Sequence, residues 1–153
     1  MENKMQCNSL FREFLLWIIL ISSICCGDTR TAFSAGPMLH WNFGLSKVSF
    51  SLGVEASYWN YYSFPKSIDF GIDFEKSAIR VYSELQTGLI FFGLSAGLVS
   101  EFKENNVSFG FQGSTWGNLY GGLDLRYRRI NEVNFICPGL YAKCPFLLKG
   151  TWI

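Results

Sequence analysis

Residues 48–58, VSFSLGVEASY, alternate strictly between apolar and small or polar side chains. The even-numbered positions are apolar, and the odd-numbered ones are Ser49, Ser51, Gly53, Glu55 and Ser57. A period of two is the signature of a β-strand with one face buried and one face in another medium. The alternation does not say which face is inside. A soluble barrel would turn the apolar face inward, and a membrane barrel would turn it outward.

The composition is unusual for a domain surrounded by water. Charged residues make up 16% of the 153 residues, against roughly 25% in typical soluble chains. Aromatic residues reach 18%, and the net charge is only +1, from 13 basic and 12 acidic residues. This balance offers no basic surface for nucleic acid, so no nucleic-acid partner is expected.

The first 27 residues differ from the rest of the chain. Lys4 and Arg12 precede an apolar run, FLLWIILISSI, which is followed by small residues up to Gly27. This order is typical of a secretory signal peptide, and the run is shorter than the roughly 20 residues of a spanning helix. The sequence therefore predicts a signal peptide at 1–27 and a β-barrel domain at 28–153. Lipid modification at Cys25 or Cys26 is the alternative.

Alternating segments follow one another along the mature chain, and no helical period appears after residue 31. Short turn-like stretches separate most of them, as in an up-and-down antiparallel barrel. We predict an all-β, eight-stranded transmembrane barrel with strands within about 32–148. The expected strands are 32–43, 47–61, 67–75, 78–90, 92–102, 107–116, 119–129 and 139–148.

Glycine decides which face is inside. An eight-stranded barrel has a narrow bore that side chains just fill, so large polar groups inside need small neighbours. Glycine weakens a strand, so glycines are not expected to concentrate on a face that is exposed to water. Only Gly113 and Gly121 lie on the apolar face of the expected strands. The polar face holds Gly36, Gly53, Gly71, Gly88, Gly93, Gly97, Gly110, Gly122 and Gly139. The sequence thus predicts a polar interior and an apolar exterior.

The polar face also carries charges of both signs, which permits the pairing that buried charges require. The predicted interior network comprises His40, Lys47, Glu55, Asp69, Asp73, Arg80, Glu84, Glu101, Asp124, Arg126, Arg128 and Lys143. Aromatic residues flank the turns at one end and are expected to form a membrane-interface girdle. They are Trp59, Tyr61, Tyr62, Phe64, Phe91, Phe92 and Trp116. The alternative is that these aromatics plug the end of the barrel.

The segment PGLYAKCPF, residues 138–146, is similar to the C-terminal assembly signal of small outer-membrane barrels of Gram-negative bacteria. Gly139, Ala142, Cys144 and the aromatic Phe146 carry this likeness, while Pro138 stands where a polar residue is usual. The chain from 32 to 148 resembles barrels of the OmpA/OmpX kind. That resemblance implies an outer-membrane location and two partners, the outer-membrane lipids and the barrel-insertion machinery.

Three functions fit this pattern. A closed barrel with a structural or envelope-stabilising role is the first. A lipid-modifying enzyme is the second, with His40 inside and Ser34, Ser49 or Glu55 as its neighbours. A lone histidine in a polar bore is more often a hydrogen-bonded filler than a catalyst. A secreted lipocalin-like carrier of apolar ligands is the third, and it would invert every face.

The cysteines and the motifs add no chemistry. Cys137 and Cys144 are seven residues apart and are expected to remain unpaired, unless Pro138 and Gly139 form a turn that joins them. No metal site, cofactor site or catalytic motif is predicted.

Overall fold

The computed structural model describes residues 31–44, 48–61, 65–89, 91–104, 106–118 and 120–147. The expectations for residues 1–27, Lys47, Tyr62 and Phe64 lie outside these described residues. Within the described ranges, no helix combines the length and the apolar character needed to cross a membrane.

Antiparallel strands make up almost all of the described chain. They are β1 (Thr31–Phe43), β2 (Val48–Asn60), β3 (Lys66–Glu75), β4 (Ala78–Leu89), β5 (Phe92–Lys103), β6 (Asn106–Gly117), β7 (Gly121–Ile130), β8 (Val133–Ala142) and β9 (Cys144–Leu147).

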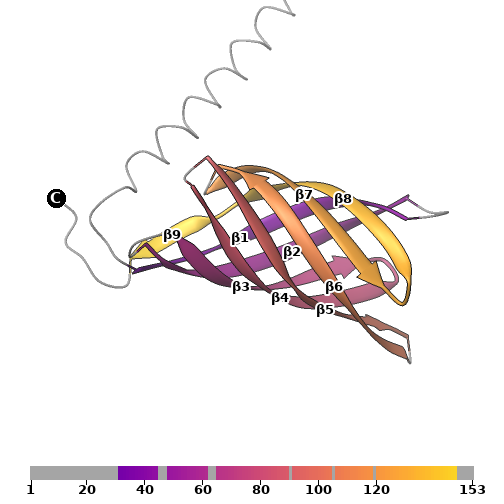
Figure 1. Cartoon of the computed structure of the whole chain (residues 1–153). Coiled ribbons are helices and arrows are strands. Elements are labelled where there is room, and N and C mark those ends of the chain that lie inside the picture. The colour runs from indigo at the N-terminus through magenta and orange to yellow at the C-terminus, as the bar shows by residue number, and fades with distance from the viewer. Residues whose placement is uncertain are drawn as a thin grey trace, which may run out of the picture.

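The sheet closes on itself. Each strand from β1 to β8 pairs with its neighbour in sequence, and β1 also pairs with both β8 and β9. β8 ends just before Lys143 and β9 begins just after it, and both pair with β1 in the same register. Together they form the eighth strand of the barrel. The fold is therefore an eight-stranded antiparallel barrel (Figure 1). The start of β1 and the end of β9 lie at the same end, which we call the terminal end. The opposite end is the far end.

The eighth strand was predicted wrongly. It begins at Val133, not at residue 139, because Cys137 and Pro138 pair with β7 without interruption. The proline lacks an N–H, but its missing hydrogen bond falls on the β1 side, where the ladder has a gap. The connection from β7 to β8 is consequently a tight turn of Asn131 and Glu132, both with positive φ. The seven earlier strands lie within about two residues of their predicted bounds.

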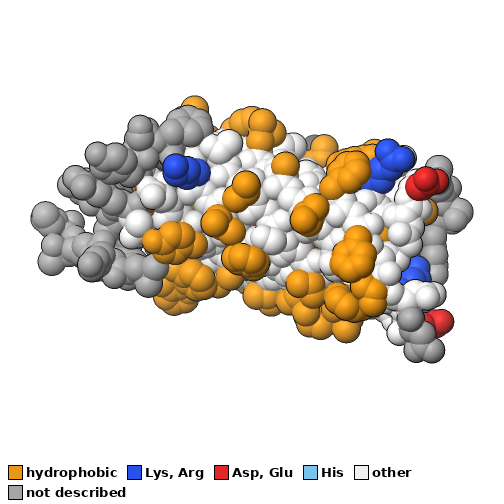
Figure 2. Space-filling model, turned by 60° about the horizontal axis from the view of Figure 1, so that its bottom comes forward, with side chains coloured by type: hydrophobic (Ala, Val, Ile, Leu, Met, Phe, Trp, Pro, Cys, Tyr) orange, Lys and Arg blue, Asp and Glu red, His pale blue; other side chains and the backbone are white. Residues whose placement is uncertain are grey.

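The apolar face is outside, as predicted. Phe50, Leu52 and Phe70 are 48%, 53% and 61% exposed on the outer wall. Asp69 and Asp73, on the opposite face of β3 from Phe70, are fully buried inside. Figure 2 shows hydrophobic side chains spread over the wall, with most of the visible charged side chains toward the far end and one basic side chain toward the terminal end. The lipocalin-like alternative, which needs these phenylalanines inside, is therefore wrong.

Two glycines show the crowding that fixes this orientation. Gly97 of β5 lies on the inner face, where an added Cβ would run into the carbonyl group of Ser83 and approach the Cα of Glu84 to 2.6 Å. Gly113 of β6 lies on the outer face, where an added Cβ would meet only the carbonyl oxygen of Ser95, at 3.2 Å. The inner wall leaves no room for even one methyl group at such positions.

Two of the predicted interface aromatics lie inside the barrel instead. Trp59 is fully buried and Trp116 almost so, with ring centroids 5.9 Å apart in an edge-to-face arrangement. Tyr61 stacks on Trp59 at 5.7 Å and is half-buried. The girdle assignment of Trp59 and Trp116 is wrong because both share the inward parity of their strands. Phe91 and Phe92 do lie exposed at the terminal end.

Candidate functional site

The barrel interior is the candidate site, because the structure gathers the charged side chains there. Inward positions on six strands, β1 to β5 and β7, together with Lys143 between β8 and β9, supply them. All of the described members of the predicted network are buried: His40, Glu55, Asp69, Asp73, Arg80, Glu84, Glu101, Asp124, Arg126, Arg128 and Lys143. Each occupies a position that alternates with a wall residue, so the strand pattern alone turns it inward.

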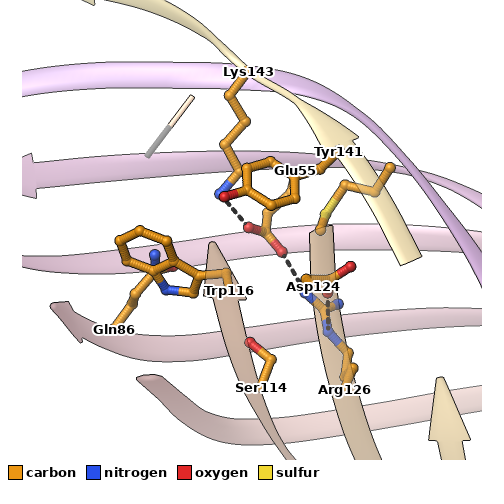
Figure 3. A pocket seen from close by; sticks show the side chains of 9 residues that line it. Glu55, Gln86, Ser114, Trp116, Asp124, Arg126, Tyr141 and Lys143 are labelled. Atoms are coloured by element: carbon orange, nitrogen blue, oxygen red, sulfur yellow. Dashed lines mark hydrogen bonds and ion pairs between the residues drawn. The ribbon is translucent and has the colours of Figure 1, made fainter. Parts of the chain in front are cut away.

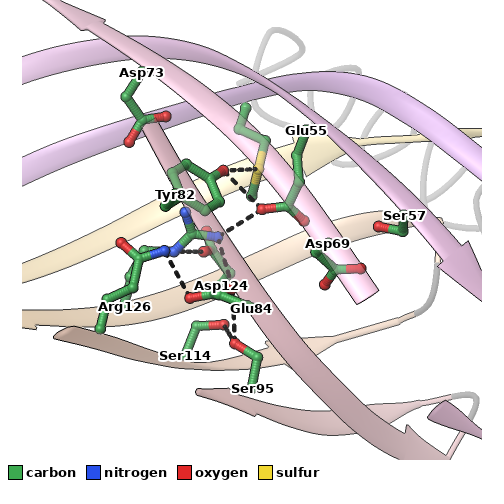
Figure 4. Close-up of polar contacts among 12 residues, drawn as sticks. Glu55, Ser57, Asp69, Asp73, Tyr82, Glu84, Ser95, Ser114, Asp124 and Arg126 are labelled. Atoms are coloured by element: carbon green, nitrogen blue, oxygen red, sulfur yellow. Dashed lines mark hydrogen bonds and ion pairs between the residues drawn. The ribbon is translucent and has the colours of Figure 1, made fainter. Parts of the chain in front are cut away.

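Arg126 of β7 lies at the centre of the network (Figure 4). Its Nη2 is 3.0 Å from Oε2 of Glu55 and 3.8 Å from Oε2 of Glu84. Its guanidinium lies 4.5 Å from the ring centroid of Tyr82, in cation–π contact. One side chain thus ties β2, β4 and β7 together across the bore.

Glu55 is the most heavily bonded acid. It accepts hydrogen bonds from the hydroxyl of Tyr82 at 2.7 Å, from Arg126 and from the ammonium of Lys143. Lys143 also donates to the hydroxyl of Ser57 at 2.9 Å. Such multiple bonding compensates for the loss of water around a buried carboxylate.

A second group of ion pairs lies toward the far end. Arg80 bonds to Glu75 at 2.6 Å and to Glu101 at 2.7 Å. Arg128 pairs with Asp73 across the bore and donates from Nε to Gln112 at 2.8 Å. The far half of the bore is therefore filled by charge pairs.

The buried acids outnumber the buried bases, and neutral donors make up the difference. Asp69 accepts from the hydroxyl of Ser67 at 2.8 Å. Glu84 accepts from Ser95 at 2.9 Å and from the amide of Gln112 at 2.8 Å. The predicted network does not include Tyr82 and Gln112, although the strand pattern puts both on the polar face. Their parity with the charged inward residues of the barrel is the signal for their inward position.

His40 does not assemble a catalytic group. Its Nε2 lies 3.0 Å from Asp124, and its Nδ1 has no partner within the described chain. The buried hydroxyl of Ser34 also has no partner there, and Glu55 is bonded to other residues. His40 is fully buried inside the wall, so it does not reach a lipid on the outer surface. The arrangement is that of an oriented interior filler.

A small cavity among the described residues lies between the polar side chains of the bore and has room for about one water molecule. Figure 3 shows Lys143, Glu55 and Arg126 converging on it, with Trp116 and Gln86 at its side. Its lining is formed by Met38, Glu55, Gln86, Ser114, Trp116, Asp124, Arg126, Tyr141 and Lys143. The Trp59–Trp116 pair packs against the terminal-end side of the network.

The two cysteines of the barrel lie on different faces of its wall. Cys137 is buried inside, Cys144 is exposed on the outer wall, and both are free thiols. They lie on opposite sides of the wall, as their odd spacing predicts. Within the described ranges, His, Cys, Asp and Glu residues form no group of three that could hold a metal ion.

This geometry defines a class of protein. A closed barrel leaves no unpaired sheet edge, an apolar outer wall suits hydrocarbon, and a filled polar bore suits ion pairing. Together these are the features of a small transmembrane β-barrel, of the kind found in bacterial outer membranes.

Comparison with known proteins adds one structural likeness. No family model and no curated protein matches the chain. A solved structure, that of Ail, the attachment invasion locus protein of Yersinia pestis, is similar at 12% identity and a TM-score of 0.41. The match covers 78% of this chain and 100% of that one. The assignment to the class rests on the barrel described above.

Proposed function

We propose that the chain is an outer-membrane barrel with a structural role, which stabilises the envelope by spanning it as a closed and filled cylinder. The observation that carries this proposal is the pairing of an apolar outer wall with a bore packed by ion pairs. A wall of this kind is stable only in lipid, and a bore of this kind passes no solute.

The turns support a structural role over recognition or transport. At the far end, the connections from β3 to β4 and from β7 to β8 have two residues each. Adhesins and transporters of this architecture need long loops or a wide lumen. The described ends of this barrel offer little surface for recognition.

The proposal includes a route of export and assembly. We expect the segment 1–27 to direct export across the inner membrane. We expect the segment 138–146, which spans β8 and β9, to engage the insertion machinery of a Gram-negative envelope. The partners of the finished barrel are then the outer-membrane lipids that cover its apolar wall. In this orientation the terminal end faces the periplasm.

Two measurements on the full-length chain test the proposal. Protein expressed in a Gram-negative host should be recovered with outer membranes. It should migrate differently on gels before and after boiling, because the closed barrel resists detergent. Purified barrel in a planar bilayer should give no steady conductance. Recovery as a buffer-soluble monomer with no boiling shift would contradict the membrane location, and a stable single-channel current would contradict the structural role.

A further inference from the structure

The ladder that closes the barrel differs from every other described ladder. We call the pairing of β1 with β8 and β9 the seam. One register runs along it, from Ala32 opposite Leu147 to Phe43 opposite Ile136, but pairing is absent at two places. The gaps fall at residues 36–37 and 41–42 of β1. All other described ladders are continuous.

Prolines account for both gaps. If the register is continued through them, Pro37 faces Ala142 in the first gap and Pro138 faces Trp41 in the second. Proline has no N–H to donate to a ladder. Pro145 also lies on the seam, opposite Ser34. Three of the four prolines in the chain are thus placed where the barrel closes.

An interior ion pair bridges the seam near the terminal end. Glu55 of β2 is paired in register with Gly36 of β1, which the continued register sets opposite Lys143. The ammonium of Lys143 reaches over Gly36 to bond with Glu55. A Cβ on Gly36 would collide with the carbonyl group of Ala142 and lie 2.7 Å from the Cα of Lys143.

A hydrogen-bonded pair of side chains bridges the seam in the middle of the barrel. Gly139 of β8 pairs with His40 of β1 on one side and with Asp124 of β7 on the other. His40 and Asp124 meet above it at 3.0 Å. A Cβ on Gly139 would lie 2.5 Å from Oδ1 of Asp124 and would also strike the ring of His40. The Lys143–Glu55 contact therefore requires a glycine at position 36, and the His40–Asp124 contact requires a glycine at position 139.

The cavity lies directly behind the seam. Its lining includes Lys143 and Glu55 of the first bridge and Asp124 of the second, together with Met38 of β1 and Tyr141 of β8 (Figure 3). An opening of the seam would therefore connect this cavity with the medium outside the wall.

From these observations we propose that the seam is a gate in the barrel wall. The Lys143–Glu55 ion pair and the His40–Asp124 hydrogen bond hold it shut where backbone pairing is missing. When they are broken, β1 separates from β8 and β9 while the other seven ladders stay intact. The proposal concerns the movement of the wall and does not depend on the structural role proposed above.

Hydrogen–deuterium exchange on the folded barrel in detergent micelles tests the gate. Amides of β1 and β8 that pair across the seam should exchange faster than those of the β4–β5 ladder in the unmodified chain. Glu55→Gln should speed seam exchange at least tenfold. The matched control is Glu101→Gln, which breaks an ion pair to Arg80 in an uninterrupted ladder and should leave seam exchange unchanged. The boiling shift verifies that each variant is folded.

A covalent lock provides the second test. Ala35 is paired directly with Cys144 across the seam, and facing Cα atoms in such a ladder lie about 4.5–5.5 Å apart, within the range for a disulfide. Oxidised Ala35→Cys should slow seam exchange in the otherwise unmodified chain and cancel the effect of Glu55→Gln, and reduction should reverse both changes. Seam exchange as slow as that of β4–β5, and unaffected by Glu55→Gln or by the disulfide, would overturn the proposal.

Discussion

Substitution of Gly97 by alanine tests the packing on which the orientation of the barrel depends. The new Cβ would run into the Ser83 carbonyl group and approach Glu84 Cα to 2.6 Å. These are backbone atoms of β4, so a rotamer change cannot relieve the contact. Overpacking of this kind costs about 1–3 kcal/mol.

The free energy of unfolding is measured by urea titration of the barrel in detergent or lipid vesicles, with tryptophan fluorescence and the boiling shift as probes. With a slope of about 1–3 kcal/mol per M urea, a loss of about 2 kcal/mol lowers the midpoint by roughly 1 M. We expect Gly97→Ala to unfold at a urea concentration lower by about this amount.

Gly113→Ala is the matched control. Gly113 pairs with Ala96 and Gly97 with Gln112, so the two glycines lie in adjacent rows of the same ladder on opposite faces. The outward Cβ meets one atom, at 3.2 Å, and alanine removes a backbone entropy cost of about 0.5–1 kcal/mol. Its midpoint should equal or exceed that of the unmodified chain. If Gly113→Ala were the more damaging change, the inference that glycines mark the crowded interior would be refuted.

Three further predictions concern the wall and the interior. In variants that retain one tryptophan, brominated lipid should quench the fluorescence of Trp41, which is 40% exposed on the wall, and leave that of Trp59 nearly unchanged; equal quenching would contradict the inward placement. Phe70→Arg should destabilise the inserted barrel by about 2–4 kcal/mol in vesicle refolding, because it puts a charge against hydrocarbon, whereas Phe70→Leu should be tolerated. His40→Ala should lower stability by about 1–3 kcal/mol, because Asp124 loses its hydrogen bond to the imidazole and keeps, among the described residues, only Arg126, whose Nε is 3.7 Å away. The lipid profile of the host should stay unchanged, and an altered profile would support the enzymatic interpretation.

The strands and their faces could be predicted from the sequence because both depend on local pattern. A period of two fixes which residues share a face, and the glycines identify the crowded one. The inward positions of Glu55, Asp124 and Arg126 follow directly. The same alternation also puts Trp59 and Trp116 on the inner face. They were assigned to the membrane interface because they lie close to a turn, and that criterion was the wrong one.

The β7–β8 connection shows where local rules fail. Pro138 suggested that no strand passes through it, yet its pairing with β7 is uninterrupted and the missing donor interrupts only the ladder to β1. Whether a proline breaks a ladder depends on which neighbour its N–H would have faced, and the sequence does not give that neighbour.

The alternation and the glycines were enough to predict an eight-stranded barrel with an apolar outside and a charged inside. The pairing of the interior side chains required the closed barrel: Glu55 meets Lys143 and Arg126, His40 meets Asp124, and Asp73 meets Arg128. Whether a side chain faces the bore depends only on its position in its own strand. Which side chain it meets there depends on the register of every ladder and on how the barrel closes. Strands far apart in sequence become neighbours only when the barrel is complete.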